Sequence, residues 1–180
     1  MKKQLRLITL FAFVCTLLVS SMAFAAPVKN AVILTYFSQN GDVQNVENSW
    51  YATVVKTVAD RLNAYGIKAV PVDMPWQEFA NAHKGQKLDP KVAQQEWGKY
   101  ISSHYDSAVN VFVDTYKVNP DKSVSVAARI IVSDTKDTQK LYSNLAGKME
   151  NVKGKPQMQA LQETLASLLQ ATKKNLDAVK

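Results

Sequence analysis

Two consecutive stretches in the second half of the chain alternate between apolar and polar residues, and this alternation constrains the fold more than any other feature. In the stretch Ser107 to Val118, valines occupy the alternate positions 109, 111 and 113. Apolar residues alternate in the same way in Ser123 to Ser133. Because successive side chains of a strand point to opposite faces, the pattern predicts two strands with one buried face each. The turn residues Asn119-Pro120-Asp121-Lys122 make these strands antiparallel neighbours.

The remaining elements of this half follow from turn residues and helical periodicity. A second turn, Asp134 to Asp137, predicts a short third strand over Thr138 to Ser143, which completes an antiparallel meander. Gly147 to Lys155 is expected to be a polar connection. Leucines at three- and four-residue intervals then predict a long amphipathic helix from Pro156 to about Ala178.

The first half has the pattern of a βαβ unit. Val28 to Phe37 is expected to be a buried strand, followed by a helix that starts at Asn48 and ends at Gly66. Ala69 to Val72 forms the second, parallel strand, and another helix follows from Pro90. The order βαβ-α-βββ-α predicts one α/β (α+β) domain over residues 26–180, a mixed sheet of about five strands with helices packed on it.

Residues 1–25 have the pattern of a secretory signal peptide. Lys2, Lys3 and Arg6 precede an apolar run, and Ala23-Phe24-Ala25 supplies the small-x-small cleavage pattern. Cleavage near Ala25/Ala26 predicts a soluble periplasmic or secreted protein with no stable membrane anchor. The alternative is an uncleaved anchor, but the run is shorter than the roughly 18 apolar residues that span a bilayer.

Cysteine content and charge exclude several classes of function. The one cysteine, Cys15, lies within the signal, so the mature chain is expected to have no disulfide, thiol nucleophile or thiolate metal site. The formal net charge is +7, but removal of the signal leaves 19 basic residues against 15 acidic ones, a charge of +4. Arg61 and Arg129 are then the only arginines. No dense basic face is present, so nucleic-acid binding is not expected.

The meander carries a resemblance to a group of bacterial envelope proteins. The run from Asp106 to Asn144, and above all Val124 to Asn144, resembles the TolB amino-terminal domain, CsgG and penicillin-binding-protein activators. These families have an opening strand, a helix with a Gly turn, a short strand, a second helix and this meander. The resemblance implies binding and assembly work in the periplasm, with no catalytic residues. Two departures stand out: there is no lipidated cysteine, and Thr135 to Thr138 replaces the usual glycine-bearing turn.

The loop after the first strand, Ser38-Gln39-Asn40-Gly41-Asp42, is similar to a flavodoxin phosphate loop. It offers few hydroxyls, and Asp42 would repel an anion. The helix starts about six residues after Gly41, which is too late to direct its N-terminus into the loop. We therefore interpret Ser38, Asn40 and Asp42 as the rim of a partner-binding surface and predict no cofactor.

Other candidates for chemistry are weaker. His83 and His104 lie in different elements without a second ligand at metal spacing, so no metal site is predicted. No serine-hydrolase motif is present, and no catalytic residue is assigned. Asp114, Arg129 and Asp134 can meet on the outer face of the meander, where a site for chemistry and a surface ion pair explain them equally well.

The segment from Met74 to Lys84 contains the strongest candidate for partner contact. It follows the carboxyl end of a parallel strand, where open α/β sheets place ligands. Trp76, Phe79 and His83 are the candidate contact residues, since large aromatic side chains act as interface anchors. The alternative is that Trp76 to Phe79 form a short helix covering the sheet edge.

The leading hypothesis is a soluble periplasmic envelope protein that acts as a non-catalytic binding or assembly module, with an envelope protein as its partner. The alternative is a flavodoxin-like or other small-molecule-binding protein that uses the loops after the first two strands. A third possibility is a hydrolase whose residues converge only in three dimensions.

Overall fold

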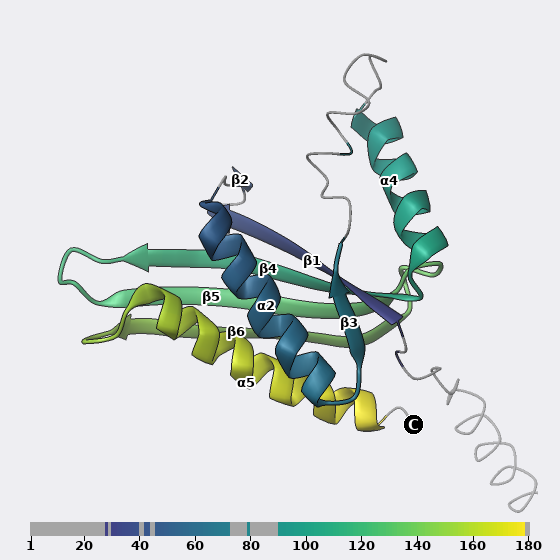
Figure 1. The fold of residues 1–180 in the computed structure, drawn as a ribbon. Helices are drawn as coiled ribbons and strands as arrows, with labels where there is room; N and C mark the ends of the chain where they lie inside the picture. The colour runs from purple at the N-terminus through teal and green to yellow at the C-terminus, as the bar shows by residue number, and fades with distance from the viewer. Residues whose placement is uncertain are drawn as a thin grey trace, which may run out of the picture.

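The computed structural model describes residues 28, 30–39, 42–43, 46–72, 79 and 90–178. They form a single α+β domain built on one mixed sheet, as the sequence predicts (Figure 1). The strands are β1 (Asn30–Gln39), the two-residue β2 (Asp42–Val43), β3 (Lys68–Pro71), β4 (Ser107–Val118), β5 (Val124–Asp134) and β6 (Leu141–Val152). The helices are α2 (Asn48–Ala64), α4 (Pro90–His104) and α5 (Gln157–Ala178).

Strand β1 is central in the sheet. It pairs in parallel with both β3 and β4, and it is fully buried over Ala31–Ile33, as its continuous apolar run predicts. Beyond β4 the sheet continues antiparallel through β5 to β6. The βαβ unit and the meander are therefore both confirmed.

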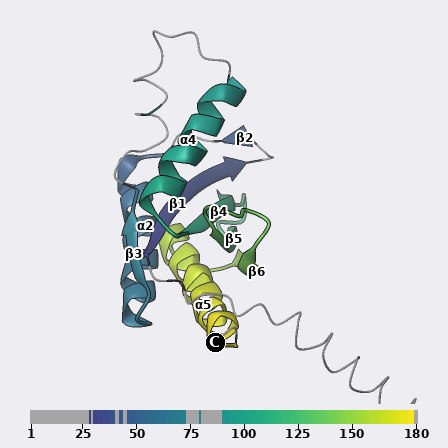
Figure 2. The ribbon, with the colours of Figure 1, turned by 90° about the vertical axis from the view of Figure 1, so that its right-hand side faces the viewer.

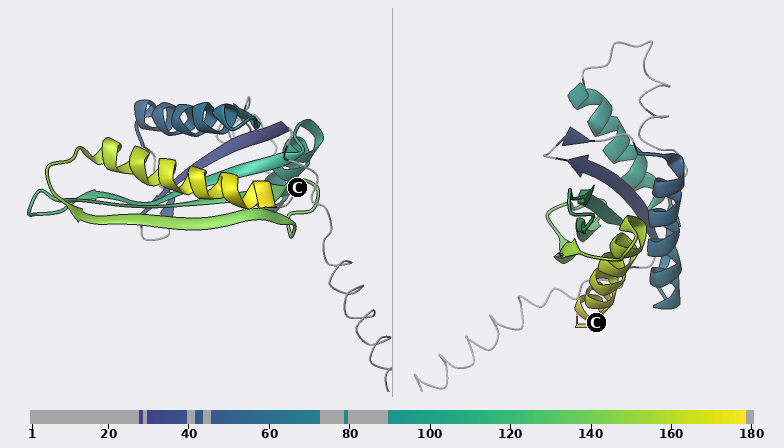
Figure 3. Two further views of the ribbon diagram at one scale, coloured as in Figure 1. Left: turned by 90° about the horizontal axis from the view of Figure 1, so that it is seen from below. Right: turned by 90° about the vertical axis from the view of Figure 1, so that its left-hand side faces the viewer.

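Helices α2 and α5 cover the same face of the sheet (Figures 1 and 3). The alternating valines and isoleucines of β4 and β5 point into this layer, where they meet the leucines of α5. Gly66 ends α2 in the left-handed conformation, with φ of 79°, and the Ile67 N–H donates to the Leu62 carbonyl at 3.0 Å. This is the helix end that Tyr65-Gly66-Ile67 predicts.

Helix α4 lies on the opposite face and covers only one end of it. Trp97 and Ile101 pack there on Val32, Leu34 and Ala108, in a second, smaller cluster. In the end-on view of Figure 2, α4 lies over β1 and away from β5 and β6. Val92 of α4 is exposed, and His104 at the end of α4 lies at the surface against the Tyr100 ring.

The prediction for the third meander strand was wrong in its bounds. Strand β6 runs from Leu141 to Val152, so Gly147 to Val152 are strand and not connection, and residues 138–140 precede it. Its length follows from packing against α5. Gly147 lets Leu168 approach so closely that an added Cβ would lie 3.2 Å from the Leu168 side chain.

Candidate functional site

The sheet face opposite α2 and α5 carries the candidate site. Beyond the end that α4 covers, no described helix packs over the outward side chains of β4, β5 and β6. We call this surface the open face. Its outward residues are Phe112, Thr115 and Lys117 on β4, Ser125, Ala127 and Arg129 on β5, and Ala146, Lys148 and Glu150 on β6.

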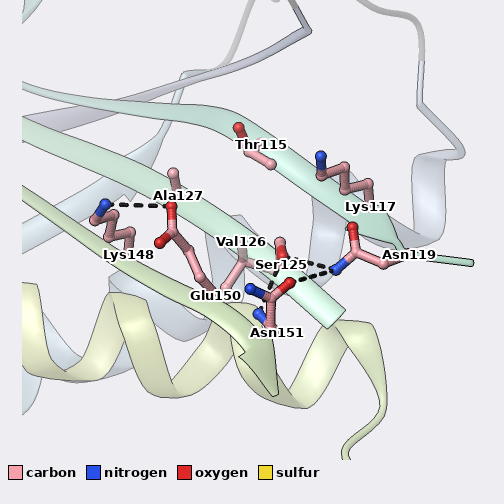
Figure 4. Close-up of a pocket in the computed structure, with 9 residues that line it drawn as sticks. All are labelled: Thr115, Lys117, Asn119, Ser125, Val126, Ala127, Lys148, Glu150 and Asn151. Carbon is pink, nitrogen blue, oxygen red and sulfur yellow. Dashed lines mark hydrogen bonds and ion pairs between the residues drawn. The ribbon is translucent and has the colours of Figure 1, made fainter. Parts of the chain in front are cut away.

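A polar hollow of about 330 Å³ lies in the open face near the β4–β5 turn (Figure 4). It forms because Ser125 and Ala127 on the middle strand are small, whereas longer side chains rise from β4 and β6 on both sides. The strand register places Lys117 opposite Ser125 and Lys148 opposite Ala127. The lining residues are Thr115, Lys117, Asn119, Ser125, Val126, Ala127, Lys148, Glu150 and Asn151.

A hydrogen-bond network closes one end of the hollow. The Asn119 side-chain nitrogen lies within hydrogen-bond distance of Ser125 Oγ at 2.9 Å and of Asn151 Oδ1 at 3.2 Å. The Asn151 backbone N–H also donates to Ser125 Oγ, at 3.2 Å. Asn151 has φ of 54°, a left-handed conformation that asparagine tolerates better than most residues. The network ties the ends of β4, β5 and β6 together, so the hollow has a fixed rim.

The charges of the hollow suit a polar partner. Lys148 Nζ lies 3.2 Å from Glu150 Oε1, and both side chains are more than half exposed. Lys117 adds a second exposed cation from the opposite side. Because the nine lining residues include no histidine, cysteine or aspartate, they provide no base paired with a nucleophile. The hollow therefore presents amide, hydroxyl and charged groups to solvent.

An ion pair and an aromatic stack border the hollow. Arg129 donates to both oxygens of Asp114, at 2.7 and 2.9 Å, and its guanidinium lies 4.8 Å from the centre of the Phe112 ring. Phe112 stacks on Tyr36 at 5.1 Å. Asp114 occupies a β-bulge between Val113 and Thr115, which turns its carboxylate toward Arg129. The Arg129 hydrogen bonds lower the pKa of Asp114 below its ordinary value.

The prediction that Asp134 joins this ion pair was wrong. Asp134 lies in the β5–β6 turn, where its Oδ1 accepts hydrogen bonds from the backbone N–H groups of Lys136 and Asp137. Its Oδ2 accepts the Tyr142 hydroxyl at 3.0 Å. These bonds hold the pKa of Asp134 below its usual range. The carboxylate stabilises a turn and is not part of the open face.

The Tyr142–Asp134 hydrogen bond predicts a loss of stability in strong alkali. Burial, the Asp134 hydrogen bond and nearby carboxylates raise the pKa of Tyr142 to about 12. Because the folded state favours the neutral phenol, its stabilisation is complete below the ordinary pKa of about 10 and is lost as the pH rises toward 12. Burial also raises the pKa of Tyr36 and Tyr51, so a spectrophotometric titration at pH 9–13 should show one fewer late-ionising tyrosine in Tyr142→Phe than in the parent. An unchanged titration curve would contradict the assignment.

The residues predicted to bind a partner are only partly described. Ser38 is half-buried, and its hydroxyl donates to Asp114 at 3.3 Å, so it lies beside the ion pair of the open face. Asp42 lies in β2, where its backbone pairs with Gln39. Asn40, Trp76 and His83 lie outside the described residues, and their proposed contacts stay predictions.

Phe79 packs inside the chain. It is 6% exposed, and its ring centre lies 5.4 Å from that of Trp97 and 6.4 Å from that of Tyr100. The Phe79 ring is thus packed on α4. Because its side chain is buried, Phe79 does not itself present a contact surface to a partner in this structure.

The loop after β1 has the geometry of a hairpin. Ser38 pairs with Val43 and Gln39 with Asp42, so β1 turns back on itself through antiparallel β2. Helix α2 begins at Asn48, and Glu47 occupies the N-cap position for which the sequence suggested Asn48. A flavodoxin phosphate loop instead runs directly into the N-terminus of a helix. Among the described residues, no group of three or more His, Cys, Asp or Glu side chains is placed to hold a metal ion.

Comparison with known proteins identifies the fold. No family model matches the sequence, and no curated protein matches it. A variant of the PelC dodecamer from Paraburkholderia phytofirmans matches with a TM-score of 0.53 and 13% identity, over 83% of this chain and 92% of that chain. A further PelC dodecamer structure from the same organism gives 0.52 and 14%, over 83% and 91%. The chain shares the fold of PelC.

A third solved structure resembles the chain less closely. Lipoprotein GNA1162 from Neisseria meningitidis has a TM-score of 0.48 and 11% identity, over 81% of this chain and 96% of that chain. No helix within the described part of the chain is both long and apolar enough to cross a membrane.

Proposed function

We propose that this chain is a non-catalytic binding and assembly module of the cell envelope, exported to the periplasm or secreted. The observation that carries the proposal is the open face, which presents the polar hollow and the Arg129–Asp114 pair to solvent. An uncovered sheet face with ordered polar side chains and no nucleophile–base pair in its hollow suits binding and not turnover. The PelC structures that share the fold are dodecamers, which supports an assembly role.

Export is tested by the mass of the mature chain. When the full sequence is expressed in a bacterium, the periplasmic or culture fraction should contain a chain that starts at Ala26. Ala23→Arg together with Ala25→Arg should retain the leader, because the cleavage site requires small residues. A chain that keeps its leader without these substitutions would contradict this part of the proposal.

Partner binding through the open face is tested by photo-crosslinking in the exporting cell. A photoreactive residue at Thr115 or Lys117 should capture discrete products, since both positions line the hollow. The matched control is Gln170, which is exposed on α5 on the other side of the sheet. Equal yields at Gln170, or no product from either hollow position, would overturn the proposal.

A second candidate function is small-molecule binding, in keeping with the flavodoxin-like alternative. The observation in its favour is the volume of the hollow, about 330 Å³, which falls at the low end of ligand pockets. A yellow colour of the purified protein, or a thermal shift with FMN that Lys117→Glu abolishes, would put this candidate first. The β1–β2 hairpin argues against a flavin phosphate in the loop itself.

A further inference from the structure

Strand β6 forms one edge of the sheet. Among the described residues it pairs with β5 alone, so the backbone N–H and C=O groups on its other side have no strand partner. Such an edge is a template for a further strand. Figure 1 shows β6 at the border of the sheet, with α5 packed on one face and crossing β6 toward its own C-terminal end.

The middle of β6 is regular and only weakly protected. Ser143–Met149 pairs residue by residue with β5, between two irregularities of the ladder. Edge strands in monomers are usually guarded by proline, by charged side chains, by bulges or by short length. This segment contains no proline, and its one charged residue is Lys148, whose Nζ lies 3.2 Å from Glu150 Oε1.

We propose that the free edge of β6 pairs antiparallel with β6 of a second copy of this chain, across a two-fold axis at Ala146. The proposal rests on the assembly role above and names the partner. Ala146 is the midpoint of the regular segment and is exposed. About this axis, Asn144 lies opposite Lys148 of the second copy, and Leu145 lies opposite Gly147.

Charge selects this arrangement over its competitors. Parallel pairing in register, or an axis moved to Lys148, would place two lysines directly opposite each other, which is destabilising. Antiparallel pairing at Ala146 opposes no like charges and brings two methyl groups together at the axis. The two polar hollows, whose rims include Lys148 and Glu150, then lie on the same face of one continuous sheet.

The test uses the absence of cysteine from residues 26–180. Under mild oxidation, Ala146→Cys should form a disulfide dimer, because its two copies meet at the axis. Asn144→Cys is the matched control on the same strand face, and it lies too far from its own copy in this register. We expect more than about tenfold more covalent dimer from Ala146→Cys, since paired strands give an effective thiol concentration far above the micromolar bulk value. The double variant Asn144→Cys with Lys148→Cys should crosslink as well.

Sedimentation of the unmodified chain provides the second readout. It should show a dimer that Ala146→Glu converts to a folded monomer, because two carboxylates would then oppose each other on an exposed face. A monomeric parent with equal crosslinking at residues 144 and 146 would overturn the pairing. Crosslinking of residue 146 to a different protein would also overturn it. If the hollow still captured products in either case, the proposed function would stand without this partner.

Discussion

Replacing Leu165 with alanine should lower the free energy of unfolding by about 3 kcal/mol, within the range of 2–5 kcal/mol found for buried leucines. Leu165 is 0% exposed, in the layer where α5 meets the valines and isoleucines of β4 and β5. The removed side-chain atoms leave a cavity that the surrounding strands cannot fill without breaking their register. Because a small domain is stable by only about 5–15 kcal/mol, this loss is a large fraction of the total.

Urea denaturation followed by circular dichroism measures this effect. The matched control is Leu141→Ala on β6, which is 51% exposed and should change the free energy of unfolding by less than about 0.5 kcal/mol. Equal losses for the two variants would mean that α5 does not contribute to the core as described.

Replacing Trp97 with alanine should release α4 from the sheet while the rest of the domain stays folded. Trp97 is 8% exposed and, with Phe79 and Ile101, anchors the smaller cluster on the α4 side. Truncation of a buried tryptophan removes about 3–5 kcal/mol of packing. The global cost should be smaller than that, because α4 can detach locally without opening the layer that contains α2 and α5.

Hydrogen exchange measured by mass spectrometry separates local from global opening. In Trp97→Ala, amides of α4 should lose protection by two or more orders of magnitude, while those of β5 and α5 keep theirs. Val92→Ala on the same helix is the control, since Val92 is 40% exposed. A uniform loss of protection across both clusters would show that α4 and the main core unfold as one unit.

Periodicity predicted most of the architecture because most elements have one buried and one exposed face. The valines of β4 and β5, the stripe of α5 and the Gly66 helix end all carry a local signal of this kind. Strand β6 carries a weaker signal beyond Ser143: it alternates only between exposed and half-buried residues, and Gly147 resembles a loop residue until Leu168 is seen against it. Local sequence could not reveal that contact.

The candidate site was harder to predict. The hollow depends on which residues of β4 and β6 flank Ser125 and Ala127, and this follows from the register and the bulge at Asp114. A usable signal was present: the outward positions of β5 change from Ile131 and Arg129 to the small Ala127 and Ser125. The resemblance to TolB, CsgG and activator proteins stays a prediction.

The central place of β1 also determines when the sheet can be completed. Ser38 at its end contacts Asp114, 76 residues later in the chain, whereas β4, β5, β6 and α5 follow one another and contact their neighbours in sequence. Local contacts form quickly, and distant ones must first overcome the entropy of loop closure. If the chain is threaded through a membrane from its N-terminus, β1 emerges first and waits longest for its partner. Under the export proposed above, its apolar run, Ala31 to Leu34, is then the segment of the sheet that stays without its β4 partner for longest.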